Sequence, residues 1–234
     1  MVEELDTNTY LCISKNEFEI YLFDIKNLNN LYSEKITFDN KTNSIDLETL
    51  DKFLKDNIFK IEKLIKGFVK NILLVVDSKN ITNVYIGLKR KNYNVLINKK
   101  DLQNSITETK EMYKKNFPNQ TIMHIIIKRF LVNEENHSIL EDSVKGDHFC
   151  LEIQFISISN DFIIEAEKVF EKYQIKVNRF LDKNYIFNFF KNENFDIPHM
   201  AYKIQCGFNQ YEVALIPKSS KKRGIFEKFF QLFS

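Results

Sequence analysis

The clearest regular pattern of apolar positions runs from Asp46 to Phe68, where apolar residues stand at positions 47, 50, 54, 58, 61 and 65. Spacings of three and four residues place these side chains on one face of an α-helix. Asp46 is the expected N-cap and Gly67 the expected end, because a short polar side chain caps backbone amides and glycine readily leaves the helix. The run 72–76, Ile-Leu-Leu-Val-Val, is apolar on both faces and predicts a buried strand.

Near the start of the chain, residues 9–25 place aromatic and β-branched residues on either side of Ser14-Lys15-Asn16. Such residues favour strands, and the polar stretch between them is typical of a turn. The pattern predicts a strand hairpin that opens a first domain, which we assign to residues 1–82.

A second domain is expected over residues 83–181. It begins with two segments, NVYIGLK and YNVLI, which we expect to form a pair of strands joined by a Lys-Asn turn. A helix over 101–116 follows, with apolar residues on one side and Pro118 closing it.

Two long extended segments come next, TIMHIIIKRFLV and HFCLEIQFISI, and we expect them to pair antiparallel. The second alternates strictly between apolar and polar residues, as a strand with one buried face does. Its expected buried residues are Phe149, Leu151, Ile153 and Phe155.

A helix over 161–173, capped by Ser159 or Asn160, and the strand IKVNRFL complete the predicted second domain. Residues 182–216 are then assigned to a return to the first domain. The elements expected in this return are a short aromatic helix NYIFNFF, a helix after Pro198, a turn at Gly207 and the strand YEVALI.

The end of the chain has a different character. Residues 217–224, PKSSKKRG, have the composition of a flexible linker, and residues 225–234 follow as a short amphipathic segment. On a helix with about 100° per residue, its apolar side chains fall within one arc of about 160°. A helix this short is unstable alone in water and needs a partner for its apolar face.

Two partners are possible for that face. The segment could be a last core helix that folds back onto the protein, or an anchor with its rings among acyl chains and its basic residues at anionic headgroups. We favour the anchor, because a flexible linker and a basic cluster precede a face made almost entirely of phenylalanine. The expected membrane-binding residues are Lys221, Lys222, Arg223, Ile225, Phe226, Lys228, Phe229, Phe230, Leu232 and Phe233.

Composition limits the function classes. The 234 residues are 44% apolar, which suffices for a core, and 34 basic against 32 acidic residues leave a formal charge of +2. This balance offers no general attraction for nucleic acid. The chain has three cysteines without paired spacing, no secretory leader pattern and no run long enough to span a bilayer. We therefore expect a cytoplasmic protein with reduced thiols.

Candidate chemistry is sparse. His124 lies among isoleucines and is best interpreted as a structural residue, and His137, His148 and His199 lack metal-ligand spacing. The cluster Lys89-Arg90-Lys91 could bind phosphate, although a solvated hairpin tip explains it better. A solvated loop likewise explains the carboxylates Glu134, Glu135, Glu141 and Asp142. With five glycines in all and no phosphate-binding or nucleophile motif, we expect no enzyme, no metal and no cofactor.

Three stretches, together with the tail, resemble the bacterial actin-like cell-division protein FtsA. The stretch ITNVYIGLKRKNYNVLINKKDLQNSI is similar to a family strand pair followed by a helix that opens in "ITxxDI". IMHIIIKRFLVNEEN and FCLEIQFISIS are similar to the following strands of the family's inserted module. The resemblance runs from about Thr9 to Leu181 and implies an actin-type lobe, an inserted strand-helix-strand-strand module and a C-terminal membrane helix.

The chain departs from this family at two places. The family has a phosphate-binding "DxGT" turn after its first strand, whereas Leu11 to Asn16 contain neither the acidic residue nor the glycine. Residues 182–216 are also too few for the second nucleotide-binding lobe, which in the family contacts FtsZ. Both departures argue against ATP binding and against the usual FtsZ contact.

The prediction is thus an α+β protein, a shortened FtsA-like chain with a partial actin-like lobe, an inserted module and an amphipathic terminal helix. Its expected function is a non-enzymatic adaptor of the division machinery, peripheral on the cytoplasmic face of the inner membrane. Expected partners are an anionic membrane surface and division proteins, and a homo-oligomer is compatible with the sequence. The alternatives are a scaffold of a pilus or secretion assembly (PilM-like) and a residual actin-like ATPase that completes its site with a second subunit.

Overall fold

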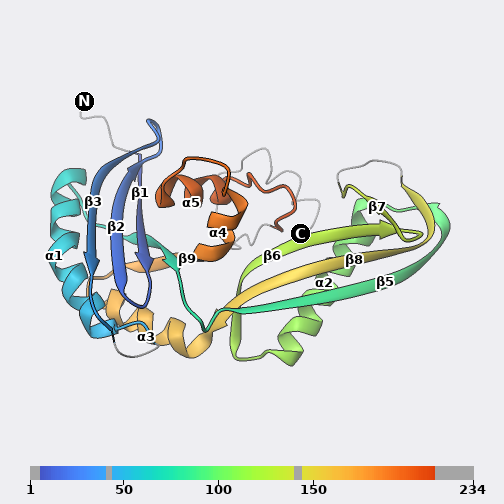
Figure 1. The fold of residues 1–234 in the computed structure, drawn as a ribbon, viewed down its shortest axis with the longest axis horizontal. Helices are drawn as coiled ribbons and strands as arrows, with labels where there is room; N and C mark the ends of the chain where they lie inside the picture. Colours follow the sequence, from blue (N-terminus) through green and yellow to red (C-terminus); the bar gives the residue numbers. More distant parts are fainter. Residues whose placement is uncertain (1–5, 41–43, 140–143, 214–234) are drawn as a thin grey trace. The chain divides into compact units, whose positions relative to one another are not determined.

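The computed structural model describes residues 6–40, 44–139 and 144–213, and the chain divides into two units (Figure 1). The described part of the first unit begins at Asp6, ends at Ile81, and resumes over Ile158–Cys206. The second unit combines Thr82–Ser157 with the described residues after Cys206. Each unit contains its own β-sheet together with helices, so the predicted α+β class is confirmed.

The sheet of the first unit has five strands in the order β3-β2-β1-β4-β9. The first three strands form an antiparallel meander, and β4 and β9 then add in parallel orientation. The bounds are β1 Thr7–Ile13, β2 Glu17–Asp24, β3 Asn29–Thr37, β4 Asn71–Val76 and β9 Lys176–Asp182. The predicted hairpin and the predicted buried strand are confirmed. β3 has no counterpart among the predicted elements, because most of its residues are polar and exposed.

Helices cover both faces of this sheet, with α1 on one side and α4 and α5 on the other (Figure 1). The predicted cap of α1 is confirmed, since the Asp46 side chain accepts hydrogen bonds from the backbone amides of Glu48 and Thr49. Side chains of α4 and α5 pack with strand residues such as Tyr10 and Leu181 in one apolar cluster. The bounds are α1 Leu47–Ile65, α3 Asn160–Glu171, α4 Lys183–Phe189 and α5 Ile197–Gln205.

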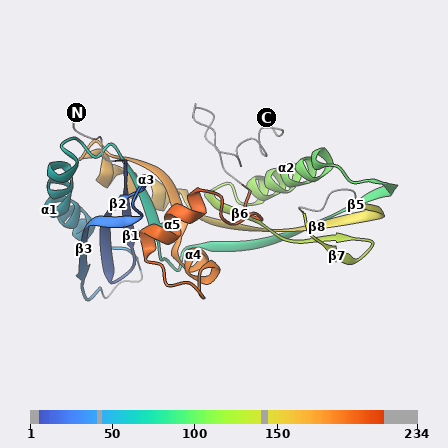
Figure 2. The ribbon, with the colours of Figure 1, turned by 90° about the horizontal axis from the view of Figure 1, so that it is seen from above.

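The sheet of the second unit has four strands in the order β5-β8-β6-β7, and α2 covers one of its faces (Figure 2). The alternation predicted for β8 is confirmed, because all four of its expected inward residues are buried. They form one core with Leu102 and Tyr113 of α2 and with residues of β6. The bounds are β5 Thr82–Leu96, α2 Lys99–Asn116, β6 Gln120–Val132, β7 Glu135–His137 and β8 Lys145–Ser159.

The hairpin predicted for residues 83–97 is wrong. The structure has one long strand, β5, which pairs antiparallel with β8 along both of its halves and is interrupted only between Lys91 and Val95. Tyr93 and Asn94 do adopt positive φ angles, as turn residues would, but the chain keeps its direction and forms a bulge. The Asn92 side chain stabilises this bulge by donating to the carbonyls of Val95 and Gly146.

The units also divide the chain differently from the predicted domains. Residues 158–181, which the sequence assigns to the second domain, belong to the first unit and include α3 and most of β9. β9 pairs in parallel with β4, a strand about a hundred residues earlier in the chain, so no local pattern indicates the pairing. The return segment divides as well, because the described residues from Gly207 onward belong to the second unit.

Candidate functional site

The predicted membrane anchor lies in the last part of the chain, after the described residues. All ten expected membrane-binding residues, from Lys221 to Phe233, lie outside the described residues, as does the linker before them. Within the described ranges, no helix is both long and apolar enough to cross a membrane.

The turn of residues 14–16 takes the place of the phosphate-binding turn of the FtsA family, and the polar groups of Ser14 are hydrogen-bonded within the hairpin. The backbone N–H of Ser14 donates to the Glu17 carbonyl at 2.9 Å, and the Ser14 hydroxyl donates to the same oxygen at 3.1 Å. The Asn40 side chain holds the turn from outside by donating to the Lys15 carbonyl at 3.1 Å. The Ser14 donors that could face a phosphate are therefore engaged within the hairpin.

A charged cluster of the first unit lies beside this turn. Lys35 Nζ is 2.6 Å from a Glu17 oxygen and 3.5 Å from a Glu19 oxygen, and Lys183 Nζ is 3.9 Å from Glu17. The pKa of the Glu17 carboxyl is lowered, first by its hydrogen bond with Glu19 and then by that with Lys35. Both lysines thus lie next to carboxylates, which would oppose the approach of a phosphate. The arrangement suits a structural ion-pair network better than an anion site.

Two of the three cysteines lie in environments that disfavour the thiolate. All three are free thiols, and burial raises the pKa of Cys12 to about 12. Burial also raises the pKa of Cys150. Since the thiolate is the reactive form, neither of these two environments favours nucleophilic chemistry at neutral pH.

His124 is fully buried, and its Nδ1 lies 2.7 Å from a carboxylate oxygen of Glu212. Glu212 belongs to a segment that runs along β6: the Ile127 N–H donates to the Tyr211 carbonyl and the Val213 N–H to the Ile125 carbonyl, both at 2.8 Å. The described part of the predicted strand YEVALI therefore pairs with β6. The His124–Glu212 pair holds it there, which agrees with the structural role expected for His124.

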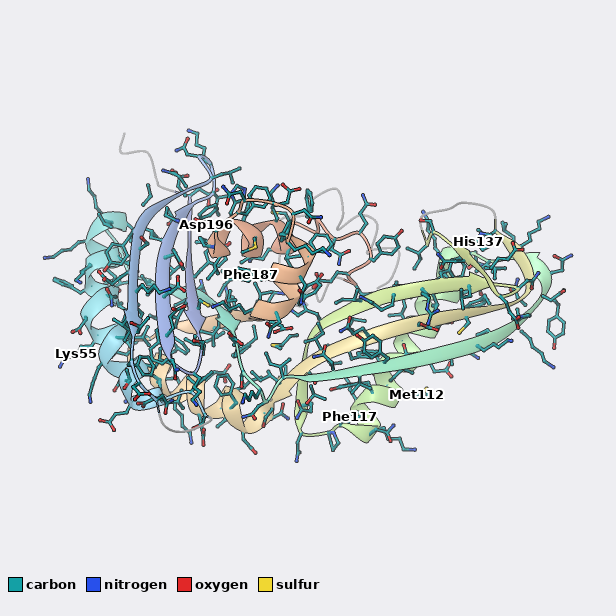
Figure 3. All side chains as sticks on the ribbon, viewed as in Figure 1. Lys55, Met112, Phe117, His137, Phe187 and Asp196 are labelled. Atoms are coloured by element: carbon teal, nitrogen blue, oxygen red, sulfur yellow. The ribbon has the colours of Figure 1, made fainter. Side chains whose placement is uncertain are left out.

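The other predicted candidates do not converge. His137 lies on β7 (Figure 3), and its ring is 6.5 Å from that of Phe130 in an edge-on arrangement. His148 lies on β8, and His199 stacks on Phe195 in the first unit. Glu134 and Glu135 lie at the β6–β7 turn, whereas Glu141 and Asp142 lie outside the described residues. In the described part of the chain, no three histidine, cysteine or acidic side chains lie close enough to hold a metal ion.

The basic cluster Lys89-Arg90-Lys91 is not a hairpin tip, because it lies inside β5. Lys89 Nζ is 3.7 Å from Glu134, and Arg90 forms an ion pair with Glu108 of α2. These pairs are partly exposed and contribute little to stability.

The feature that sequence reasoning missed is the outer edge of β5. In the described residues β5 pairs only with β8, so one side of this strand of 15 residues offers unpaired backbone groups. Tyr85 is 63% exposed on the face opposite α2, and Gly87 lies two residues further on that face. The alternation of Val84, Ile86 and Leu88 with these two residues was the available signal, but the expected hairpin hid it.

No protein-family model matches the sequence, and no curated protein is significantly similar to it. Solved structures similar to the chain include a PilM-PilN type IV pilus biogenesis complex, with 5% identity and a TM-score of 0.49 over 78% of this chain and 49% of that one. Another is the cytoplasmic domain of EpsL, an inner-membrane component of the type II secretion system of Vibrio cholerae, with 6% identity and a TM-score of 0.37 over 75% of this chain and 57% of that one.

A third similar structure, from Bacteroides thetaiotaomicron, is a protein of unknown function with an actin-like ATPase fold. It has 14% identity and a TM-score of 0.35 over 82% of this chain and 60% of that one. The chain thus spans about half to three fifths of the lengths of these proteins. The likeness concerns the fold alone, and the resemblance to FtsA in particular stays a prediction.

Proposed function

We propose that this chain is a non-enzymatic adaptor that holds a protein-docking module at the cytoplasmic face of a bacterial inner membrane. The open edge of β5 is the observation that carries the docking role, since an unpaired strand edge is a common surface for recognition of another protein. The linker and phenylalanine-rich segment of residues 217–234 support the membrane role by their sequence.

The membrane role predicts binding that depends on lipid charge and on salt. The full chain is expected to sediment with vesicles of anionic lipid and not with vesicles of phosphatidylcholine alone. Three basic residues near the surface contribute about 1 kcal/mol each. Raising the salt from about 0.1 M to about 1 M shortens the screening length from about 10 Å to about 3 Å and should release most of the protein. Equal binding to both lipids would contradict the proposal.

The proposed non-enzymatic role predicts that the chain does not bind ATP with magnesium. The engaged donors of Ser14 and the carboxylates of Glu17 and Glu19 support this expectation. Isothermal titration calorimetry of the full chain with ATP and Mg²⁺ should give no binding heat. Micromolar affinity would instead favour the alternative of a residual actin-like ATPase.

The assembly that uses the adaptor is either a pilus or secretion system or the division machinery. The resemblance of three stretches and the tail to FtsA favours the division machinery, and the pilus or secretion scaffold is the alternative to test beside it. Purified chain should be titrated with the cytoplasmic parts of inner-membrane pilus or secretion proteins from the same genome, with FtsZ in parallel. Adjacency of its gene to those for FtsQ and FtsZ would favour the division role.

A further inference from the structure

The outer edge of β5 is unusual for its length and exposure. Edge strands in most proteins are short or covered, because a long free edge can pair with any other strand. β5 covers Thr82–Leu96, and in the described part of the chain no strand pairs with its outer side. We therefore expect the unpaired backbone groups of this edge to bind another strand.

The side chains of β5 differ between its two halves. The first half, up to Leu88, contains no charged residue, whereas Lys89, Arg90 and Lys91 follow directly. Charged residues on an edge oppose pairing with another strand. The uncharged first half can therefore pair with another strand, whereas the basic residues of the second half oppose such pairing.

Tyr85 and Gly87 form a complementary pair on the exposed face of that first half. Tyr85 is 63% exposed. A Cβ atom added at Gly87 would have no atom within 4 Å, so the space above this glycine is empty. An aromatic ring on a neighbouring strand stabilises a strand glycine by covering it.

We propose that the occupant of this edge is β5 of a second copy of the chain, paired antiparallel with Ile86 opposite Ile86. This inference rests on the docking role proposed above for the same edge and names the partner there as a second copy of the chain, whereas it does not depend on the membrane role. In this register Tyr85 of each copy lies opposite Gly87 of the other, so both rings cover a glycine. On the other face, Val84 lies opposite Leu88 of the second copy.

The residues on that other face support the same register. Val84 and Ile86 are half-buried and pack against the apolar core under α2. Pairing through Ile86 would join the two cores across the edge, and cross-strand apolar pairs are the main source of stability between strands. The two four-stranded sheets would become one continuous sheet.

The charges favour this register over the others. With Ile86 at the centre, Lys89 lies opposite Asn83 of the second copy, and the basic clusters are separated. A register centred on Arg90 would place the two basic clusters against each other, which is unfavourable. The pairing is self-complementary and closes at two copies, because both chains use the same edge of β5.

Sedimentation velocity over a range of protein concentrations tests the dimer. The wild-type chain is expected to dimerise, and Gly87→Lys should raise the dimer dissociation constant by about tenfold or more, since two identical contacts are lost. Nothing near Gly87 obstructs a side chain, so the variant should fold. Gly67→Lys is the matched control, because Gly67 is exposed in the first unit and an added Cβ there meets only the Ile65 carbonyl at 3.9 Å.

Cysteine cross-linking tests the register even if a variant changes stability. In the background Cys206→Ser, which removes the exposed native thiol, Ile86→Cys should form a disulfide-linked dimer under mild oxidation. Opposite Cβ atoms lie about 5 Å apart in such a pair. Leu88→Cys should not cross-link, because Leu88 faces Val84 of the second copy.

Three results would overturn the proposal. A wild-type chain that stays monomeric at every concentration excludes the dimer. Dimerisation of Gly87→Lys at wild-type strength means that another surface pairs the chains. Equal cross-linking at positions 86 and 88 excludes the register.

Discussion

Changing Phe226 and Phe229 together to glutamate is expected to abolish binding of the chain to anionic vesicles without unfolding it. Both rings belong to the apolar arc predicted for residues 225–234. Each replacement loses roughly 1 kcal/mol of partial apolar burial and adds repulsion of about 1 kcal/mol from an anionic surface. The summed loss of about 4 kcal/mol corresponds to a decrease in affinity of roughly a thousandfold. Vesicle co-sedimentation and thermal unfolding should be measured on the same samples.

The double change of Gln231 and Ser234 to glutamate is the matched control, because both positions lie outside the apolar arc. This variant adds the same charge but keeps the apolar face. It should therefore lose only the electrostatic part of the binding free energy, about 2 kcal/mol, so that measurable vesicle binding remains. Equal loss in both variants would show that charge alone drives binding. A lower unfolding temperature of the Phe226 and Phe229 variant would instead support the alternative of a last core helix.

Replacing Tyr113 with alanine is expected to destabilise the second unit by about 3–5 kcal/mol. The ring is fully buried, stacked between Phe117 and Phe155 with centroids 4.9 and 4.8 Å away. Its hydroxyl forms a hydrogen bond with Ser157 of β8. The change therefore removes the stacking and the hydrogen bond by which this residue joins α2 to the sheet, and it leaves a cavity. Hydrogen exchange followed by mass spectrometry resolves the loss of protection in residues 82–157.

Met112, the neighbouring residue on α2, provides the control (Figure 3). It is 43% exposed, and Met112→Ala should change the stability by less than about 0.5 kcal/mol. Tyr113→Phe keeps the stacked ring and should cost only about 1 kcal/mol for the lost hydrogen bond. Unchanged exchange protection in Tyr113→Ala would refute the assigned role of this ring.

Much of the local structure could be predicted from neighbouring residues. The apolar spacing of α1 and the cap at Asp46 lie within a few positions of each other, and so does the alternation of β8. A helix or strand buries one face, and its period appears directly in the order of the residues. These predictions are confirmed for that reason.

Features that depend on strand partners distant in sequence were predicted wrongly or not at all. Tyr93 and Asn94 have the positive φ angles of a hairpin turn, yet the strand continues, because β8 is long enough to pair on both sides of the bulge. The position of β9 beside β4 likewise depends on a strand far away in the chain. The candidate docking edge follows from the same fact, since an edge is defined only by which strands are paired.

The sequence by itself determined the helices and most strands, the α+β class and the structural character of His124, because each depends on side chains a few residues apart or on composition. The tertiary structure decided that Glu212 is the partner of His124, that β5 is one strand and that its outer edge is open. These features arise from pairing between segments separated by tens of residues. Local patterns cannot encode them, because a strand's backbone groups can pair equally well with those of many other strands.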